Sequence, residues 1–244
     1  MSFLSSLSIS TERSHPFPYD INAIKFAKHI DISAPVTFII GDNGTGKSTL
    51  LETLAVRLQL PHMDGVGYYK NSFSAARTLT PYLELEWKIE RSRGFFFRAE
   101  DFGDLVNSID REDTRLHNSF KDIEGEIPDH ILQQMKDSAN YQIYRVRRDY
   151  GQDLQGFSHG EAYLKIMNDT ITGDGIFLLD EPEAALSPSK QLSLLYFIQE
   201  HLKSHMSQFI IATHSPMLMA FPSATIYEVT DYGMNKVSLE ETEH

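Results

Sequence analysis

The chain has no cysteine, few basic residues and no long apolar run. Without cysteine, its 244 residues form no disulfide, thiolate metal site or cysteine nucleophile, which fits a reducing, intracellular compartment. No apolar run approaches the roughly 20 residues that span a bilayer, and the first residues lack a signal-peptide pattern. We therefore expect a cytoplasmic protein that does not insert into membranes. The 22 basic residues against 34 acidic ones give a net charge of −12, so only a local basic patch could bind nucleic acid.

Short apolar runs predict the buried strands of an α/β domain. Hydrophobic residues make up 41% of the chain, which is enough for one sizeable core. The predicted strands cover residues 36–40, 95–97, 176–179 and 209–211. Helical segments follow three of them, at residues 47–58, 189–203 and 216–220. Strands that alternate with helices predict a mainly parallel sheet whose two faces are both covered.

A more polar segment separates the second predicted strand from the third. Residues 101–150 are charged and short of β-branched runs, and their apolar residues recur at helical spacing. The residues at this spacing are Ile123, Ile127, Ile131, Leu132 and Met135. We expect a helical lobe over about 101–170 within a single domain of residues 1–244, because neither a flexible linker nor a repeat divides the chain.

The first predicted strand runs into a sequence typical of a phosphate-binding loop. It matches G-x-x-x-x-G-K-[ST] between a strand and a helix, with Gly41, Asp42, Asn43, Gly44, Thr45, Gly46, Lys47, Ser48 and Thr49. The glycines let backbone N–H groups turn inward, and the start of the helix adds further donors. Lys47 then suits the β- and γ-phosphates, and the Ser48 hydroxyl suits Mg²⁺. The alternative is a glycine-rich turn that binds nothing.

Two further predicted strands end in residues suited to phosphate chemistry. Asp180 and Glu181 follow the strand at 176–179, at the end where α/β sheets bind ligands. Asp180 is placed to hold Mg²⁺, and Glu181 to polarise the water that attacks the γ-phosphate. His214 follows the strand at 209–211, where its imidazole can bond the γ-phosphate or that water. The alternatives are two solvated acids and a histidine that serves only the fold.

Ser158 and Glu161 form a capping-box pattern before a predicted helix. Serine at the N-cap and glutamate three residues later would satisfy N–H groups at the start of that helix. This explanation is complete without a ligand. A capped helix N-terminus is also an anion site, so the pattern becomes functional only if other motifs accompany it.

In order and spacing, these motifs resemble those of ATP-binding-cassette (ABC) ATPases. Gly41 to Thr49 is similar to Walker A, Ser158 to Glu161 to the signature, Ile176 to Glu181 to Walker B, and His214 to the switch histidine. The likeness is to the non-transporter branch, with its structural-maintenance-of-chromosomes (SMC) heads, overcoming-lysogenization-defect-type ATPases and small bacterial ATPases commonly labelled AAA family. The phrases that point to the last group are Gly94 to Glu100, Glu181 to Pro188 and Ala212 to Pro216. The implied fold is a P-loop NTPase head of the ABC type.

The resemblance implies ATP and Mg²⁺ as cofactors and a homodimer that forms on ATP binding. Each ATP would lie between the Walker motifs of one subunit and the signature of its partner, so Ser158 and Gly160 would contact the partner's nucleotide. The implied catalytic residues are Lys47, Glu181 and His214. The implied metal ligands are Ser48, Asp180 and Glu100, the last in place of the family's usual glutamine.

Two residues depart from the family pattern, and the adenine-stacking residue is open. His159 stands where the signature has a glycine, and Ser187 where the D-loop has an acidic residue, so the departures concern the rate of hydrolysis more than binding. An aromatic residue ahead of the phosphate loop often stacks on adenine in the family. Phe17 or Tyr19 could do so, although ordinary packing is our preferred interpretation.

We expect an ATPase that dimerises on ATP to drive or gate a partner protein or a nucleic-acid process. The alternatives are the nucleotide-binding subunit of an ABC transporter and a slow, ATP-gated interaction switch. The absent glutamine disfavours the transporter. Arginines gather near the predicted lobe and leave contact with nucleic acid open, namely Arg91, Arg93, Arg98, Arg145, Arg147 and Arg148.

Overall fold

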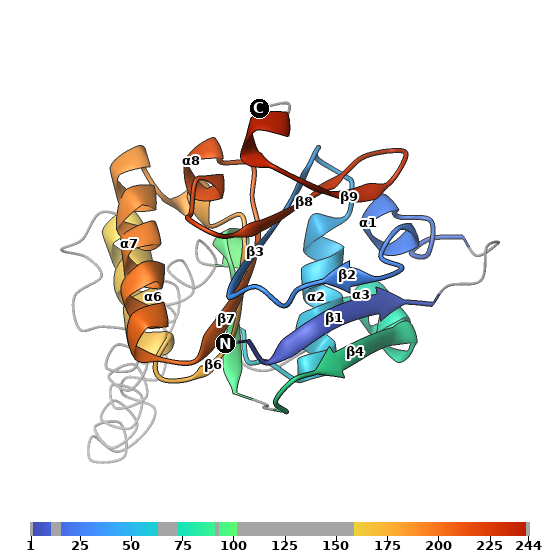
Figure 1. Ribbon diagram of the computed structural model, residues 1–244, viewed down its shortest axis with the longest axis horizontal. Helices are drawn as coiled ribbons and strands as arrows, with labels where there is room; N and C mark the ends of the chain where they lie inside the picture. Colours follow the sequence, from blue (N-terminus) through green and yellow to red (C-terminus); the bar gives the residue numbers. More distant parts are fainter. Residues whose placement is uncertain (1, 11–15, 63–72, 91–92, 102–158, 243–244) are drawn as a thin grey trace, which may run out of the picture.

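The predicted parallel sheet is present and forms the centre of the protein (Figure 1). A computed structural model describes residues 2–10, 16–62, 73–90, 93–101 and 159–242. Within these residues, one sheet has the strand order β5-β6-β7-β3-β8-β9. Its strands are β3 (Val36–Gly41), β5 (Gly94–Arg98), β6 (Gly175–Asp180), β7 (Ser207–Ala212), β8 (Thr225–Val229) and β9 (Met234–Val237). All neighbours pair in parallel except β8 and β9, so the α/β prediction is confirmed.

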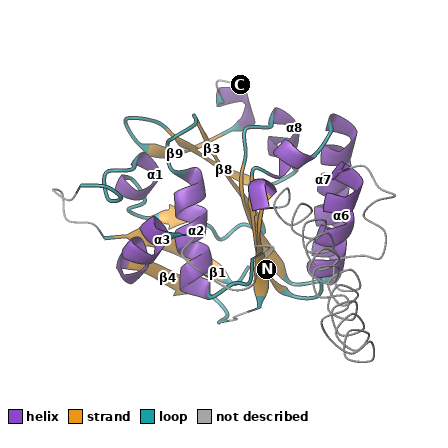
Figure 2. Ribbon diagram, turned by 180° about the vertical axis from the view of Figure 1, so that it is seen from behind, coloured by secondary structure: helices purple, strands orange, loops and turns teal. Residues whose placement is uncertain are grey.

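Helices cover one face of this sheet, as Figures 1 and 2 show from opposite sides. They are α6 (His159–Thr170), α7 (Pro188–Ser204) and α8 (Pro216–Met219), with the short 3₁₀ helix η3 (Pro182–Ala185) before α7. Alternate residues of the central strands point into the core beneath them, including Phe38, Phe177 and Phe209. Tyr163 of α6 is fully buried among them. The large aromatic side chains therefore fill the space between sheet and helices.

The opposite face is covered by α2 (Lys47–Leu58) and by a second, antiparallel sheet that the sequence patterns do not predict. The strand order is β2-β1-β4, with β1 (Leu4–Ile9), β2 (Ile30–Asp31) and β4 (Leu83–Trp87). The short helices α1 (Asn22–Lys25), α3 (Ser74–Leu79) and η1 (Thr80–Tyr82) lie in the same half of the chain, and η4 (Leu239–Glu241) lies near the C-terminus. Leu50, Leu51 and Leu54 of α2 pack in a core shared by both sheets. Both faces of the parallel sheet are thus covered, as predicted.

Most of the predicted helical lobe lies outside the described residues, because the description stops at residue 101 and resumes at 159. From the predicted lobe, α6 is the one helix that is described, and its buried residues pack against the parallel sheet. In the described part of the chain, no helix combines the length and apolar character needed to cross a membrane.

Gln208 joins the two sheets through its buried side chain. It lies on β7 and is fully buried. Its Oε1 accepts hydrogen bonds from the N–H groups of Phe3 at 3.1 Å and Leu4 at 2.9 Å, and its Nε2 donates to the carbonyl oxygens of Leu4 at 3.2 Å and of Ile32. One amide therefore satisfies backbone groups of the chain's first strand and of the segment after β2.

We expect Gln208→Leu to lower the free energy of unfolding by about 2–4 kcal/mol, because it strands several buried backbone groups at once. Urea unfolding followed by circular dichroism measures the change. Gln199→Leu, on the exposed side of α7, makes the same substitution without a buried partner and serves as the control. Equal unfolding midpoints for the two variants would contradict the role of Gln208.

Candidate functional site

Strand register brings the three predicted motifs to one edge of the parallel sheet. Asp180 pairs with Ala212 across β6 and β7, and Ala212 pairs with Ile39 across β7 and β3. The residues that follow these three positions therefore leave the sheet together. They begin the phosphate loop, the acidic turn and the loop of His214. Because all three strands are parallel, the site lies at their carboxyl ends, as predicted.

The phosphate loop requires glycine where the backbone is left-handed and closely packed. Gly41 has φ of +139° and Gly46 has φ of +93°. A Cβ at Gly41 would collide with the carbonyl oxygen of Val229 on β8, and a Cβ at Gly46 would collide with the side chain of Ile21. Any larger residue would therefore displace the loop from its neighbours. Gly44, at φ of +83°, faces open space instead.

Lys47 is buried inside the loop that precedes it. Its side chain is only 4% exposed, and its Nζ donates to the carbonyl oxygens of Gly41 at 2.8 Å and Asp42 at 3.1 Å. Burial lowers the pKa of Lys47, although the carboxylates of Glu181 and Asp180 oppose this shift. A phosphate in the loop would supply the full counter-charge that the two carbonyl oxygens lack.

Ser48 and Asp180 connect the phosphate loop to the acidic end of β6. The Ser48 hydroxyl donates to Asp180 Oδ1 at 3.1 Å, across 132 residues of sequence. Asp180 is 6% exposed, and burial raises its pKa to about 6. The pair offers a hard cation the oxygen ligands that Mg²⁺ takes, and a cation there would offset the buried charge of the carboxylate. These two predicted ligands fit the metal.

Arg98 forms a cluster with acidic side chains beside Asp180, which the sequence patterns do not reveal. At the end of β5, its guanidinium is 3.3 Å from Glu52 Oε1, 3.8 Å from Asp101 Oδ1 and 3.9 Å from Asp180 Oδ2. It also pairs with Glu100, the third predicted metal ligand, whose side chain is 68% exposed. The structure thus places Glu100 on the guanidinium, without a described contact to Ser48 or Asp180. Burial raises the pKa of Glu52 to about 7, although Arg98 acts to lower it.

Glu181 and His214 lie close enough to act together. His214 Nε2 is 3.4 Å from Glu181 Oε1, and both side chains are partly exposed. Glu181 has a left-handed backbone with φ of +47°, held by its N–H bond to the Ala212 carbonyl at 2.9 Å. Glu183 fixes the other strand end, since its Oε1 accepts the His214 backbone N–H at 2.6 Å. In the sequence, Glu183 is marked only by its place in the acidic run that begins at Asp180.

The predicted signature lies largely outside the described residues. Ser158 is not described, and α6 begins at the backbone of His159, so the predicted contact of this motif with a partner's nucleotide stays a prediction. Gly160 lies against η3, where an added Cβ would stand 3.2 Å from the Ala185 carbonyl oxygen. Glu161 pairs with Lys190 of α7 at 3.0 Å. The start of α6 is thereby packed on the segment that follows Glu181.

The remaining predicted positions have simpler surroundings. Ser187 is exposed at the N-cap of α7, with its Oγ 3.2 Å from Ser189 Oγ. Tyr19 packs edge-on against Tyr82, with ring centroids 5.5 Å apart, while Phe17 is 68% exposed. The packing of Tyr19 agrees with the ordinary role that we favoured for it.

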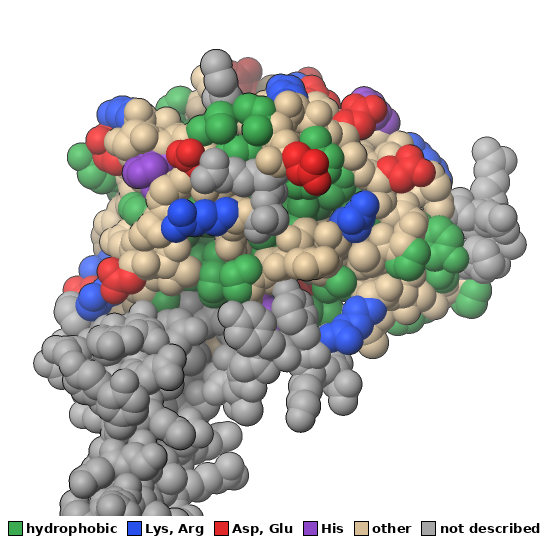
Figure 3. Space-filling model, turned by 90° about the horizontal axis from the view of Figure 1, so that it is seen from below, with side chains coloured by type: hydrophobic (Ala, Val, Ile, Leu, Met, Phe, Trp, Pro, Cys, Tyr) green, Lys and Arg blue, Asp and Glu red, His purple; other side chains and the backbone are tan. Residues whose placement is uncertain are grey.

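Of the six arginines that gather near the predicted lobe in the sequence, the structure describes Arg93 and Arg98. Arg98 is held by carboxylates, and Arg93 donates to the Thr172 hydroxyl at 3.4 Å. The other four lie outside the described residues, namely Arg91, Arg145, Arg147 and Arg148. On the face drawn in Figure 3, basic side chains are scattered among acidic and hydrophobic ones.

Comparison with known families and structures agrees with this geometry. The family described as "AAA domain" matches residues 7–152, and a second AAA-domain family, whose description also names an AbiEii toxin and a type IV TA system, matches residues 149–220. A search of curated proteins found no matching sequence. The SMC head domain of Pyrococcus furiosus, solved with an extended coiled coil and bound to the C-terminal domain of ScpA, is 14% identical, with a TM-score of 0.51 over 99% of this chain and 98% of that one.

Two further structures give lower scores over similar coverage. An SMC head bound to the C-terminal winged-helix domain of ScpA is 14% identical, with a TM-score of 0.47 over 98% of this chain and 99% of that one. A transporter described as being of the metal-chelate ABC type, in an inward-facing conformation, is 16% identical, with a TM-score of 0.49 over 99% and 85%. The fold is therefore that of an SMC head, on the evidence of the Pyrococcus structure.

We expect Glu52→Gln to change the pH dependence of stability. The pKa of Glu52 is raised from 4.5 to about 7, so its contribution to stability is complete below about pH 4.5 and is lost as the pH rises through 7. The variant should therefore gain stability relative to the parent between pH 5 and pH 8, on the order of 1 kcal/mol. Urea unfolding at the two pH values measures this gain. Glu84→Gln, at an exposed position of β4, is the control and should show no gain in stability over the parent between these pH values.

Proposed function

Because the chain belongs to the AAA-domain family, we propose that it binds ATP with Mg²⁺ at the carboxyl edge of the parallel sheet and hydrolyses it. The observation that carries this proposal is the 3.1 Å contact between Ser48 and Asp180. It joins a loop suited to phosphate with a carboxylate suited to Mg²⁺, and strand register adds Glu181 and His214 at the same edge. A phosphate loop alone would support binding only.

Each residue at this edge has a distinct role in the proposal. Lys47 exchanges the carbonyl oxygens of Gly41 and Asp42 for phosphate oxygens, while the loop's N–H groups hold the β-phosphate. Ser48 and Asp180 would hold Mg²⁺, which when bound would supply positive charge for the phosphate oxygens. Glu181 accepts a proton from the attacking water, and His214 orients that water or the γ-phosphate. Glu100 joins the metal ligands only if its carboxylate leaves Arg98.

The proposal includes an ATP-dependent homodimer that gates a partner protein or nucleic acid. The signature motif supports this, because Ser158 and Gly160 would complete the site of the second subunit. The SMC head in the Pyrococcus structure binds the C-terminal domain of ScpA, so this fold can carry a protein partner. The alternative, a slow ATP-gated interaction switch, would use the same residues to bind ATP but would hydrolyse it at a negligible rate. Measuring turnover separates the two.

Lys47→Ala should weaken ATP binding at least tenfold, because the loop would lose the buried ammonium that meets the phosphates. Isothermal titration with Mg²⁺ and ATP measures the dissociation constant. Lys203→Ala removes an exposed lysine of α7 that pairs with Glu200, and it should bind ATP like the parent. An unchanged affinity in Lys47→Ala would mean that the loop does not bind nucleotide.

Glu181→Gln should keep ATP affinity and lower the turnover number by about a hundredfold or more, since the amide cannot take a proton from water. Phosphate release measures turnover, and gel filtration with ATP should show an accumulated dimer. Glu84→Gln provides a carboxylate control away from the site. Full turnover in Glu181→Gln would remove it as the general base, and negligible turnover in the parent would favour the slow switch.

A further inference from the structure

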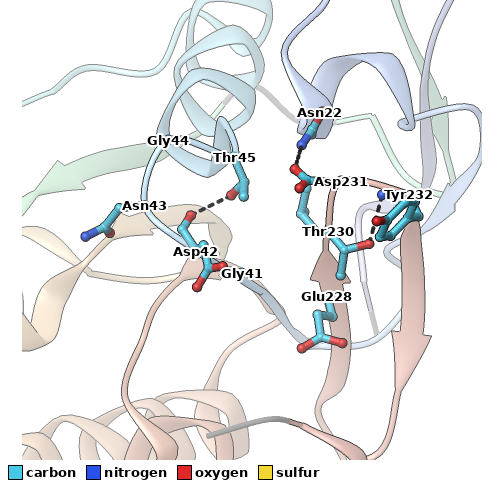
Figure 4. A pocket seen from close by; sticks show the side chains of 11 residues that line it. Asn22, Gly41, Asp42, Asn43, Gly44, Thr45, Glu228, Thr230, Asp231 and Tyr232 are labelled. Carbon is cyan, nitrogen blue, oxygen red and sulfur yellow. Dashed lines mark hydrogen bonds between the residues drawn. The ribbon is translucent and has the colours of Figure 1, made fainter.

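A cavity of about 670 Å³ lies beside the phosphate loop, on the side of β8 (Figure 4). It is bounded by one arm of the loop, the turn between β8 and β9, and the start of α1. The lining residues used below are Asn22, Asp42, Glu228, Thr230, Asp231 and Tyr232. Its volume falls in the range of small-molecule sites. None of the catalytic residues proposed above lines it.

The sheet topology fixes the end of the nucleotide that would reach this cavity. Strands β7 and β6 lie on one side of β3. They are followed by His214 and Glu181, which the proposed function places at the γ-phosphate and the attacking water. Strand β8 lies on the other side of β3. A nucleotide whose phosphates fill the loop with the γ-phosphate toward β7 must therefore extend its nucleoside toward β8.

We infer that this cavity receives the adenine base and ribose of the nucleotide, an assignment that rests on the proposed ATP site. The negative charge of the cavity lining favours the uncharged nucleoside over the phosphates of the nucleotide. Gly41 to Thr45 of the phosphate loop form one side of the cavity, while Glu228 and Asp231 line the side away from the loop, and carboxylates so placed repel a phosphate. The same carboxylates can accept hydrogen bonds from an amino group or from ribose hydroxyls.

Asn22 supplies an amide that matches the edge of adenine. Its Nδ2 donates to Asp231 Oδ1 at 3.0 Å, so the side chain bridges α1 and the β8–β9 turn across the cavity rim. An asparagine amide has a second N–H and an acceptor oxygen, and such an amide pairs with the amino group and a ring nitrogen of adenine. The contact with Asp231 restricts the orientation of the amide before a ligand binds.

Tyr232 supplies an aromatic ring at the turn. The side chain is 94% exposed, the largest exposed fraction among the described large hydrophobic residues. Its backbone is held in place, because its N–H donates to Thr230 Oγ1 at 3.2 Å and the Thr230 N–H donates to the Gly233 carbonyl at 2.9 Å. A base that stacked on this ring would cover an aromatic surface now in solvent. Tyr19, one of the two aromatic residues ahead of the loop that could stack on adenine, already packs against Tyr82.

The test compares ATP with inorganic tripolyphosphate, which fills the loop but has no nucleoside. Isothermal titration with Mg²⁺ should give an ATP affinity about tenfold weaker for Asn22→Ala and for Tyr232→Ala, from one lost base contact each. Tripolyphosphate should bind these variants as it binds the parent, which also shows that they fold. Tyr196→Ala removes a tyrosine of α7 that is 65% exposed and lies outside the cavity lining, and it should alter neither affinity.

The outcomes separate the cavity from the loop. Lys47→Ala should weaken both ligands, and if it weakens neither, the proposed ATP site fails and the cavity assignment fails with it. If Lys47→Ala weakens both while Asn22→Ala and Tyr232→Ala bind ATP like the parent, the ATP site stands and the cavity assignment is wrong. It is also wrong if Phe17→Ala alone weakens ATP, because Phe17 does not line the cavity and the base would then lie outside it.

Discussion

The buried carboxylate of Asp180 sets the constraint that the rest of the site must meet. At 6% exposure, its charge is costly unless opposite charge and hydrogen bonds surround it. The protein supplies the Ser48 hydroxyl at 3.1 Å and the Arg98 guanidinium at 3.9 Å, yet the pKa of Asp180 is still raised to about 6. Compensation is therefore incomplete. A metal ion bound at this carboxylate would supply the missing charge, which ties the energetics of the fold to its ligand.

Placement of that carboxylate depends on β7, the strand between the phosphate loop and the acidic strand end. Its pairing with β3 and β6 puts Ile39, Ala212 and Asp180 level across the sheet. A shift of β7 by one residue would exchange the residues that face α2 with those that face α7. Gln208 opposes such a shift, because its amide is bonded to the antiparallel sheet on the α2 side only. The same residue thus supports both the union of the two sheets and the alignment of the site.

Local patterns predicted the elements whose signals are local. The run at 36–40 and the glycines after it fixed the position of β3 and the loop, because a buried parallel strand is continuously apolar and the loop needs glycine at set positions. The antiparallel sheet was missed because β2 has two residues and β1 pairs with β4 through an irregular register between Leu4 and Ser6. Neither β1 nor β2 has a clean alternation of apolar and polar residues. The third strand, β4, does alternate from Leu83 to Trp87, but one alternating strand does not identify its partners.

The Arg98 cluster could not be predicted for a different reason. Arg98 and Glu52 are distant in sequence, and only the packing of α2 against β5 and β6 brings them within 3.3 Å. Glu100 was assigned to the metal by its place after a strand, whereas its nearest cation in the structure is Arg98. Motifs reveal residues that meet a ligand, but they carry no information about side chains that neutralise one another across the fold.

This pairing means that nucleotide binding is an exchange of partners. Lys47 already donates to two loop carbonyls, and Arg98 already pairs with carboxylates. In the proposed site, phosphate would replace the carbonyl contacts of Lys47, and a metal ion would share Asp180 with Arg98 and Ser48. The net affinity is therefore the difference between two well-paired states, not the sum of the new contacts. Because Arg98 contacts Asp180, Glu52 and the segment that includes Glu100 and Asp101, a cation at Asp180 would redistribute charge toward the chain that follows β5.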